Sequence, residues 1–386
     1  MSFIQQFQKY ELPILTNGVK LPIFEPTELQ FKEYNNGKRC SNYELLSILC
    51  KKGLEEKILN KVNKNKLPEY HERLKYELKA IEEMGFTDYI LMIWDICDFG
   101  NKNDIPRGPG RGSVCSSLLC FLIGITEIDA VFYGTYFSRF LNKTRAKVKI
   151  IDGIKYIDGS LCPDIDQDQD YFRRNEIIGH INCRYKGKTS KLLTTTTFTS
   201  KILIKDVYKC FENANEDEAN HVSNLIEKIH GNPEEISDAL SDDKEKENKE
   251  FKEWSKNHGQ TCKISMQLSG LKRGLGQHAS AILVSADKID DIMPLQLSKE
   301  KEIISGYDMY SSQELSLKID ELGLKTLSHI DRICNLVGIK SKDIDVHDKS
   351  IYEYLENFEY PQGIFQFETP AQGGIAKKIK CKNFKQ

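Results

Sequence analysis

The chain has 386 residues, 39% hydrophobic and 29% charged, so it can bury a sizeable core and is expected to form two or three domains. Its formal net charge of −2 gives no overall attraction to nucleic acid, so any basic binding surface must be local. Eleven scattered cysteines without a Cys-x-x-Cys pair indicate reduced thiols in a cytoplasmic protein, and exclude a disulfide framework or a zinc site.

No segment predicts secretion or membrane insertion. Residues 1–17 lack the basic start and apolar core of a secretory signal. The longest apolar run, Leu118 to Ile125, is far too short to span a bilayer. We therefore expect a cytoplasmic protein without a membrane partner.

The first third of the chain predicts core-forming helices. The pattern Ser-Asn-Tyr-Glu at 41–44 is typical of a capping box and predicts a helix up to Leu54. Apolar residues recur at helical spacing over 69–84, and Gly85 follows where a left-handed cap would end that helix. A second helix is expected over about 89–99.

A glycine-rich segment, Arg107-Gly-Pro-Gly-Arg-Gly-Ser113, comes just before a run that is expected to be helical, 116–122. Glycines before a helix let backbone N–H groups approach an anion, and Arg111 and Ser113 can add donors. The segment suits a triphosphate, and a plain loop is the alternative interpretation. It is neither a Walker A loop nor a dinucleotide fingerprint.

An acidic stretch, Pro163-Asp-Ile-Asp-Gln-Asp168, follows an expected hairpin whose turn is Asp152-Gly153. If Asp164 and Asp166 lie on a strand, their carboxylates emerge on one face while Ile165 points to the other. Two such carboxylates form a platform for a hard divalent cation that also binds substrate phosphate oxygens. The chemistry indicated is phosphoryl transfer, and a solvated acidic loop is the alternative.

Several motifs then occur in one order along the chain. Taken together, they resemble the C family of DNA polymerases, that of the bacterial replicative polymerase III alpha subunit, over roughly residues 40–386. The motifs are Glu77-Leu78, Met84-Gly-Phe86, Gly108-Pro-Gly-Arg-Gly-Ser113, Arg139-Phe-Leu-Asn142, Pro163–Asp168, Lys201–Val207, Gly276-Gln-His-Ala279, Leu317–Leu327 and Gly363–Glu368.

The resemblance implies an α+β fold: a nucleotidyltransferase-like palm, with a mixed β-sheet and flanking helices, interrupted by a helical thumb. The expected domains are a lead-in segment (1–66), the first palm segment (67–199), the helical thumb (200–270), the second palm segment (271–330) and the truncated start of the fingers (331–386).

The resemblance also implies the site. Its catalytic and metal-binding residues would be Asp164, Asp166 and Asp320, holding two Mg²⁺ ions, although Mn²⁺ suits the same oxygen ligands. Asp168 would support them. Lys318, two residues before Asp320 on the same strand face, could reach the phosphates. The triphosphate ligands would be Arg111, Gly112, Ser113, Arg139 and Lys318.

Two further features are interpreted with the resemblance. Lys201, Lys205 and Lys209 recur at helical spacing and form a basic ridge suited to a DNA backbone, or else a solvated helix face; their place in the expected thumb favours DNA. His278 is expected to be structural. Gln169 stands where the family usually has an aromatic residue, which predicts looser packing behind the metal site.

The expected reaction is template-directed transfer of a deoxynucleotide to a primer 3′-hydroxyl, with primer–template DNA and deoxynucleoside triphosphates as substrates. Because the chain lacks the family's phosphoesterase-type domain, we expect no proofreading. Because it stops soon after the fingers begin, we expect one piece of a split polymerase, completed by a second polypeptide. The alternatives are a template-independent nucleotidyltransferase on the same palm and a non-catalytic DNA-binding or scaffold fragment.

Overall fold

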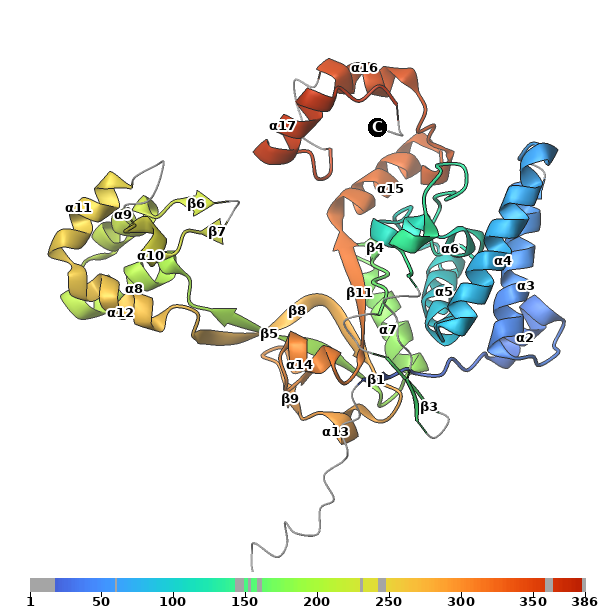
Figure 1. Cartoon of the computed structure of the whole chain (residues 1–386), viewed down its shortest axis with the longest axis horizontal. Coiled ribbons are helices and arrows are strands. Elements are labelled where there is room, and N and C mark those ends of the chain that lie inside the picture. Colours follow the sequence, from blue (N-terminus) through green and yellow to red (C-terminus); the bar gives the residue numbers. More distant parts are fainter. Residues whose placement is uncertain are drawn as a thin grey trace, which may run out of the picture. The chain divides into compact units, whose positions relative to one another are not determined.

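The computed structural model describes residues 18–59, 61–142, 149–151, 154–157, 162–229, 232–241, 248–357 and 364–383. The chain divides into two compact units (Figure 1). Unit 1 comprises residues 1–192 and 279–386, and unit 2 comprises residues 193–278. Within the described residues, no helix has the length and apolar content needed to cross a membrane.

A six-stranded mixed sheet carries the candidate site. Its strand order is β4-β11-β8-β5-β10-β9, with β4 parallel to β11, and β11 antiparallel to β8. The outer ends of the two long strands, β5 and β8, belong to unit 2. The bounds are β4 Gln167–Asp170, β5 Thr189–Thr197, β8 Lys272–Val284, β9 Leu295–Leu297, β10 Ile303–Ser305 and β11 Leu317–Leu324.

Helices from the first half of the chain form the main core of unit 1 (Figure 1). Helix α6 packs against α3 and α4, and α5 packs against α3 and α7. Leucine, isoleucine and aromatic side chains of these helices are buried together with Ile282 and Ile319 of the sheet. The helices are α2 Glu28–Asn35, α3 Asn42–Leu54, α4 Leu67–Glu83, α5 Thr87–Lys102, α6 Leu118–Leu122 and α7 Arg174–Arg184.

Local sequence signals determine where these helices begin and end. The capping box predicted at Ser41 is present, because its hydroxyl accepts from the Glu44 N–H and the Glu44 carboxylate accepts from the Ser41 N–H. Gly85 has a φ of 77°, and its N–H donates to a carbonyl of the last turn of α4. Both predictions are confirmed.

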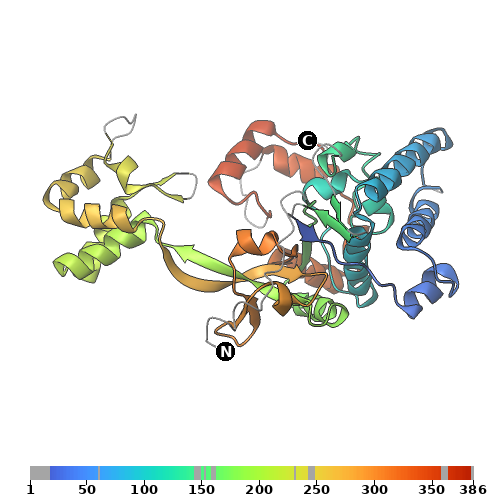
Figure 2. The same cartoon turned by 60° about the horizontal axis from the view of Figure 1, so that its bottom comes forward.

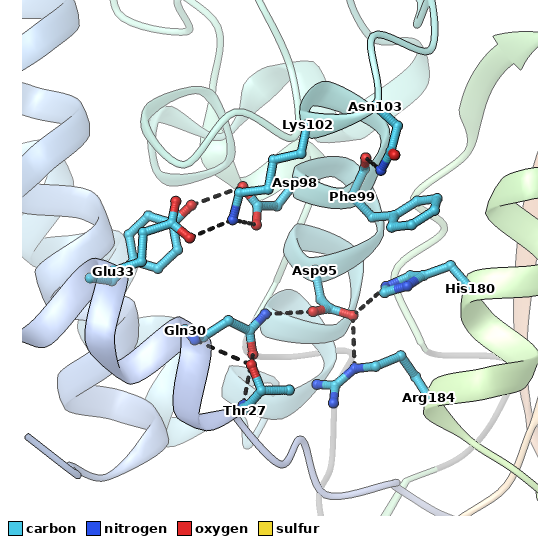
Figure 3. A network of polar contacts seen from close by, with 11 residues as sticks. Thr27, Gln30, Glu33, Asp95, Asp98, Phe99, Lys102, Asn103, His180 and Arg184 are labelled. Atoms are coloured by element: carbon cyan, nitrogen blue, oxygen red, sulfur yellow. Dashed lines mark hydrogen bonds and ion pairs between the residues drawn. The ribbon is translucent and has the colours of Figure 1, made fainter. Parts of the chain in front are cut away.

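A buried carboxylate joins three helices of unit 1 (Figure 3). Asp95 of α5 accepts hydrogen bonds from Gln30 of α2 at 2.5 Å and from Arg184 of α7 at 3.1 Å. It also lies 2.8 Å from His180 Nε2, whose ring stacks on Phe99. The pairing of Asp95 with α7 connects the helical core to the segment that leads into β5.

Unit 2 is helical, with a short hairpin (Figure 2). Its core contains Ile204, Val222, Ile236 and Phe251. The elements are α8 Ser200–Glu212, α9 Glu216–Leu225, β6 Lys228–Ile229, β7 Asn232–Pro233, α10 Ile236–Ala239, α11 Lys249–Asn257 and α12 Gly259–Leu268.

The remaining elements belong to unit 1. They are β1 Val19–Lys20, β2 Lys149–Ile151 and β3 Ile154–Ile157, which form a small sheet in the order β1-β3-β2, and α13 Ile289–Ile292, α14 Met309–Gln313, α15 Lys325–Val337, α16 Lys349–Asn357 and α17 Pro370–Ile379. The expected turn at 152–153 lies outside the described residues, although β2 and β3 pair antiparallel on either side of it. The predicted α+β class, a mixed sheet with flanking helices, is confirmed.

Candidate metal and nucleotide site

The acidic stretch runs into the edge strand of the sheet. Asp164 and Asp166 lie in the segment before β4, which begins at Gln167, so the expected strand starts later than the pattern suggested. The predicted alternation is nevertheless present: Asp164 is exposed and Asp166 half-buried, while Ile165 is buried. The two carboxylates therefore share a face of the chain.

Strand β11 brings the third aspartate to this face. Its parallel register with β4 pairs Glu321 with Gln167, and continuing that register by one residue places Asp320 opposite Asp166. Asp320 and Lys318 are half-buried, whereas Ile319 between them is buried. Lys318 Nζ lies 2.8 Å from Asp320 Oδ2, so the predicted shared face of these two residues is confirmed.

The carboxylates repel one another and are balanced by two cations. Burial and the neighbouring charge of Asp320 raise the pKa of Asp166, while Arg111 acts in the opposite direction. Arg111 Nη1 lies 3.2 Å from Asp168 Oδ1, and Arg111 Nε lies 3.7 Å from Asp166 Oδ2. The two cations are thus Arg111 of the glycine-rich segment and Lys318 of β11.

The donor set fits a hard divalent cation. Asp320 Oδ1 is buried without a hydrogen-bond partner among the described residues. Burying an ionised oxygen without a partner costs free energy, and a bound cation would remove that cost. Within the same residues, no group of three or more acidic, histidine or cysteine side chains is arranged so that it could hold a metal ion by itself. An open platform of this kind is what Mg²⁺ uses when substrate phosphates and water supply its other ligands. Asp164, Asp166 and Asp320 would hold it.

The glycine-rich segment lies along the free edge of β4. Gly108 N–H donates to the Asp168 carbonyl at 2.8 Å, and Asp170 N–H donates to the Pro106 carbonyl at 2.9 Å. A Cβ added at Gly108 would lie 2.9 Å from the Cβ of Asp168, so only glycine fits there without movement. The segment covers an edge that would otherwise be open and fixes the position of Asp168.

The helix that follows these glycines is already capped. A 3₁₀ turn spans Gly112–Ser116, and the N–H groups of Leu118 and Leu119 at the start of α6 donate to the buried Glu77 carboxylate. Arg73 pairs with the same carboxylate at 2.5 Å. Glu77 is therefore the anion at the N-terminus of α6. Triphosphate binding by Arg111, Gly112 and Ser113 of the glycine-rich segment stays a prediction.

The other expected triphosphate ligands lie on exposed or half-buried turns. Gly112 is exposed with a φ of 69°, and Ser113 beside it is half-buried. Arg139 ends a short 3₁₀ turn, Phe137–Arg139, and is exposed. Their role towards a triphosphate stays a prediction.

Comparison with known protein families shows to which family the chain belongs. A family model described as the bacterial DNA polymerase III alpha NTPase domain matches residues 44–323. A second, described as the bacterial DNA polymerase III alpha subunit finger domain, matches residues 326–386. The chain belongs to the bacterial DNA polymerase III alpha family.

Individual members of this polymerase III alpha family cover most of the chain. The DNA polymerase III subunit alpha of Aquifex aeolicus is 30% identical over 94% of the chain and 32% of its own length. The corresponding subunit of Ureaplasma parvum is 31% identical over 99% of the chain and 38% of its own length. The DNA polymerase III subunit alpha of Thermus aquaticus is 30% identical over 80% of the chain and 24% of its own length. The chain spans well under half the length of these relatives.

The lysine ridge of this polymerase III alpha homologue is partly neutralised. Lys201, Lys205 and Lys209 lie on α8 as predicted, but Lys205 and Lys209 both pair with Glu216 at the start of α9. Hydrogen bonds from these two lysines lower the pKa of Glu216 to about 2. Binding of a DNA phosphate by this ridge stays a prediction. His278 is half-buried on β8.

Sequence reasoning did not find three residues behind the aspartates. They are Arg107 and Gln167, which are joined by a hydrogen bond, and Glu321, which lies opposite Gln167 in the strand register. Gln169 is fully buried and donates to Glu321 at 2.8 Å. The sequence does contain one signal: polar residues occupy the buried positions of the alternating patterns in β4 and β11. That signal can be recognised only when the two strands are aligned with each other.

Proposed function

We propose that this chain is the catalytic palm of a template-directed DNA polymerase, transferring a deoxynucleotide to a primer 3′-hydroxyl. The observation that carries the proposal is the position of Asp320 on β11 opposite Asp166, the residue just before β4, with Lys318 and Arg111 beside them. Family membership agrees with this chemistry. Because the chain spans only a fraction of its relatives' length, the activity itself is a proposal.

Each residue of the site has a role in this reaction. Asp164, Asp166 and Asp320 are oxygen ligands on one open face, and two Mg²⁺ ions bound there would activate the primer hydroxyl and neutralise the pyrophosphate. Lys318 pairs with Asp320, and Arg111 donates to the neighbouring Asp168. Both cations would donate to phosphate oxygens when a triphosphate binds. Gly112, Ser113 and Arg139 would complete the triphosphate contacts.

The two units suggest a division of labour. The sheet of unit 1 would act as the palm, the helices of unit 2 as a thumb that binds the primer–template duplex through Lys201, Lys205 and Lys209, and residues 331–386 as a portion of the fingers. The finger-domain match to residues 326–386 supports the last assignment. A second polypeptide that completes the enzyme stays a prediction.

Primer extension tests the proposed function. The purified chain is given a primed DNA template, Mg²⁺ and the four deoxynucleoside triphosphates, alone and with a polypeptide that supplies the remaining family domains. We expect products that follow the template and are lost in the Asp166→Asn variant. Products independent of the template would indicate a template-independent nucleotidyltransferase instead.

Measuring the affinity for primed DNA distinguishes the remaining alternative, a non-catalytic DNA-binding fragment. If neither the chain alone nor the mixture extends a primer, while Asp166→Asn leaves the affinity for primed DNA unchanged, the chain is a DNA-binding fragment and the proposal is wrong. If mixing gives no gain over an active chain alone, the prediction of a completing polypeptide fails while the catalytic proposal stands.

A further inference from the structure

Directly behind the aspartates lies a set of polar side chains, which we call the buried polar layer: the buried Gln167, Gln169 and Glu321, and the half-buried Arg107. Gln167 is 2% exposed, and Gln169 and Glu321 are 0% exposed. Gln167, Gln169 and Glu321 alternate along the two strands with Asp166, Asp168 and Asp320, whereas Arg107 belongs to the glycine-rich segment. The carboxylates therefore occupy one face of the strand pair, and the polar layer occupies the other.

Specific hydrogen bonds connect this layer. Gln169 Nε2 donates to Glu321 Oε2 at 2.8 Å, which joins β4 to β11 through side chains. Arg107 Nη1 donates to Gln167 Oε1 at 2.9 Å. The same guanidinium donates to the carbonyls of Ile125 at 3.0 Å and Gly124 at 2.7 Å, so it fastens β4 to the turn after α6.

The layer is poorly explained as a source of stability. Gln169 Oε1, Glu321 Oε1 and Gln167 Nε2 are buried without hydrogen-bond partners among the described residues. Apolar side chains of similar volume would fill such a position at equal or lower free energy. The layer therefore calls for another role.

Strand register is what the layer specifies. A slip of one residue between β4 and β11 would turn every side chain to the opposite face of its strand. In the observed register Glu321 lies opposite Gln167, and Gln169, two residues further along β4, reaches Glu321 diagonally. A one-residue slip would turn one of the two side chains away and would also remove Asp320 from its place opposite Asp166. Strand β4 has only four residues, so its backbone hydrogen bonds alone hold it weakly.

We propose that the buried polar layer is a positioning device for the metal-binding carboxylates: Glu321 and Gln169 keep Asp320 and Asp166 opposite each other on one face. The inference rests on the proposed function, since it assumes that these aspartates bind metal. Glu321 and Gln169 touch neither metal nor substrate and act through the strands that carry the aspartates. Loss of groups that orient metal ligands typically lowers metal affinity 10–100-fold.

Binding of Mn²⁺, measured by electron paramagnetic resonance on the full chain at pH 7, tests the inference without relying on activity. The variants are Glu321→Leu and Gln169→Leu, singly and together, and Glu321→Gln, whose amide can still accept from Gln169. Ile319→Val is the matched control, because it lies on the same buried face of β11 and leaves the layer intact. Thermal unfolding of each variant monitors stability.

We expect Glu321→Leu to weaken Mn²⁺ binding about tenfold or more, with no loss of thermal stability. Gln169→Leu should do the same, the double variant should add little to either change, and Glu321→Gln should bind within about twofold of the parent. Parent-like binding by both leucine variants would overturn the inference, as would an equal loss in Ile319→Val.

The Asp320→Asn variant separates this inference from the proposed function. If the parent binds Mn²⁺ through Asp320 and the leucine variants lose it, but no primer is extended, the positioning role stands and the polymerase proposal fails. If the parent extends primers and the leucine variants bind Mn²⁺ normally, only the positioning role fails. Absence of any Asp320-dependent binding in the parent would overturn both.

Discussion

Lys318 Nζ lies 2.8 Å from Asp320 Oδ2, two residues apart on one face of β11. In the proposed site the ammonium group would compete with a metal ion for the same carboxylate and would also bind substrate phosphates. We predict that Lys318→Met tightens Mn²⁺ binding several-fold and lowers single-nucleotide incorporation about 100-fold. Lys318→Arg, which keeps the charge, is the control. Weaker Mn²⁺ binding in Lys318→Met would show that the lysine supports the metal site directly.

Gly108 provides a second test, because its Cα packs against Asp168. Alanine at this position would place a Cβ 2.9 Å from the Asp168 Cβ and push β4 or the glycine-rich segment away. We predict that Gly108→Ala lowers nucleotide incorporation about 100-fold and destabilises the fold by about 1–3 kcal/mol. Gly179→Ala in helix α7 is the control, because a Cβ added there meets nothing within 4 Å. This variant should raise the free energy of unfolding by about 0.5–1 kcal/mol.

The three-helix junction at Asp95 makes a prediction about pH (Figure 3). Burial alone would raise the pKa of Asp95, but the hydrogen bond with His180 and the charge of Arg184 outweigh it and the pKa is lowered. A lowered pKa adds stability that is present above the ordinary aspartate value of about 3.9 and is lost as the pH falls through the native value.

Replacing this carboxylate should therefore matter most near neutrality. We expect Asp95→Asn to lower the free energy of unfolding by about 2–4 kcal/mol at pH 7, with the difference from the parent shrinking below about pH 4. Chemical denaturation at several pH values measures it. Glu72→Gln, which changes an exposed carboxylate on α4, should behave like the parent throughout. A difference that stays constant down to about pH 2 would rule out the ionic origin.

Local signals in the sequence were enough to predict much of the fold. The Ser41–Glu44 capping box and the glycine at 85 determine helix ends through contacts within one turn, so reading the chain alone finds them. Alternation within β11 likewise predicts that Lys318 and Asp320 share a face. These features depend on neighbours a few residues apart.

What could not be predicted depends on residues far apart in the chain. Glu77 caps α6, about forty residues later, and therefore takes the helix terminus that the glycine pattern assigned to a triphosphate. Glu216 pairs with two lysines only because α8 and α9 pack together. The Gln169–Glu321 bond joins residues 152 positions apart, and nothing at either position alone reveals the partner.

The neutralised ridge on α8 yields a prediction about DNA. Removing the Glu216 carboxylate releases Lys205 and Lys209 for phosphate binding. If the ridge contacts DNA, Glu216→Gln should tighten binding of primed DNA several-fold at low salt and steepen the dependence of log affinity on log salt by about 1–2. Asp217→Asn, with the same charge change on an exposed neighbouring residue, should have a much smaller effect. Equal responses from the two variants would mean that the ridge does not contact DNA.

Incorporation of a single deoxynucleotide opposite a known template base, compared between the parent, Asp320→Asn and Asp168→Asn, addresses the catalytic assignment most directly. If Asp164, Asp166 and Asp320 form the metal site, Asp320→Asn should abolish incorporation of the matching nucleotide, whereas Asp168→Asn, which changes a supporting carboxylate, should retain a measurable rate. Incorporation at the parent rate by Asp320→Asn would contradict the assignment.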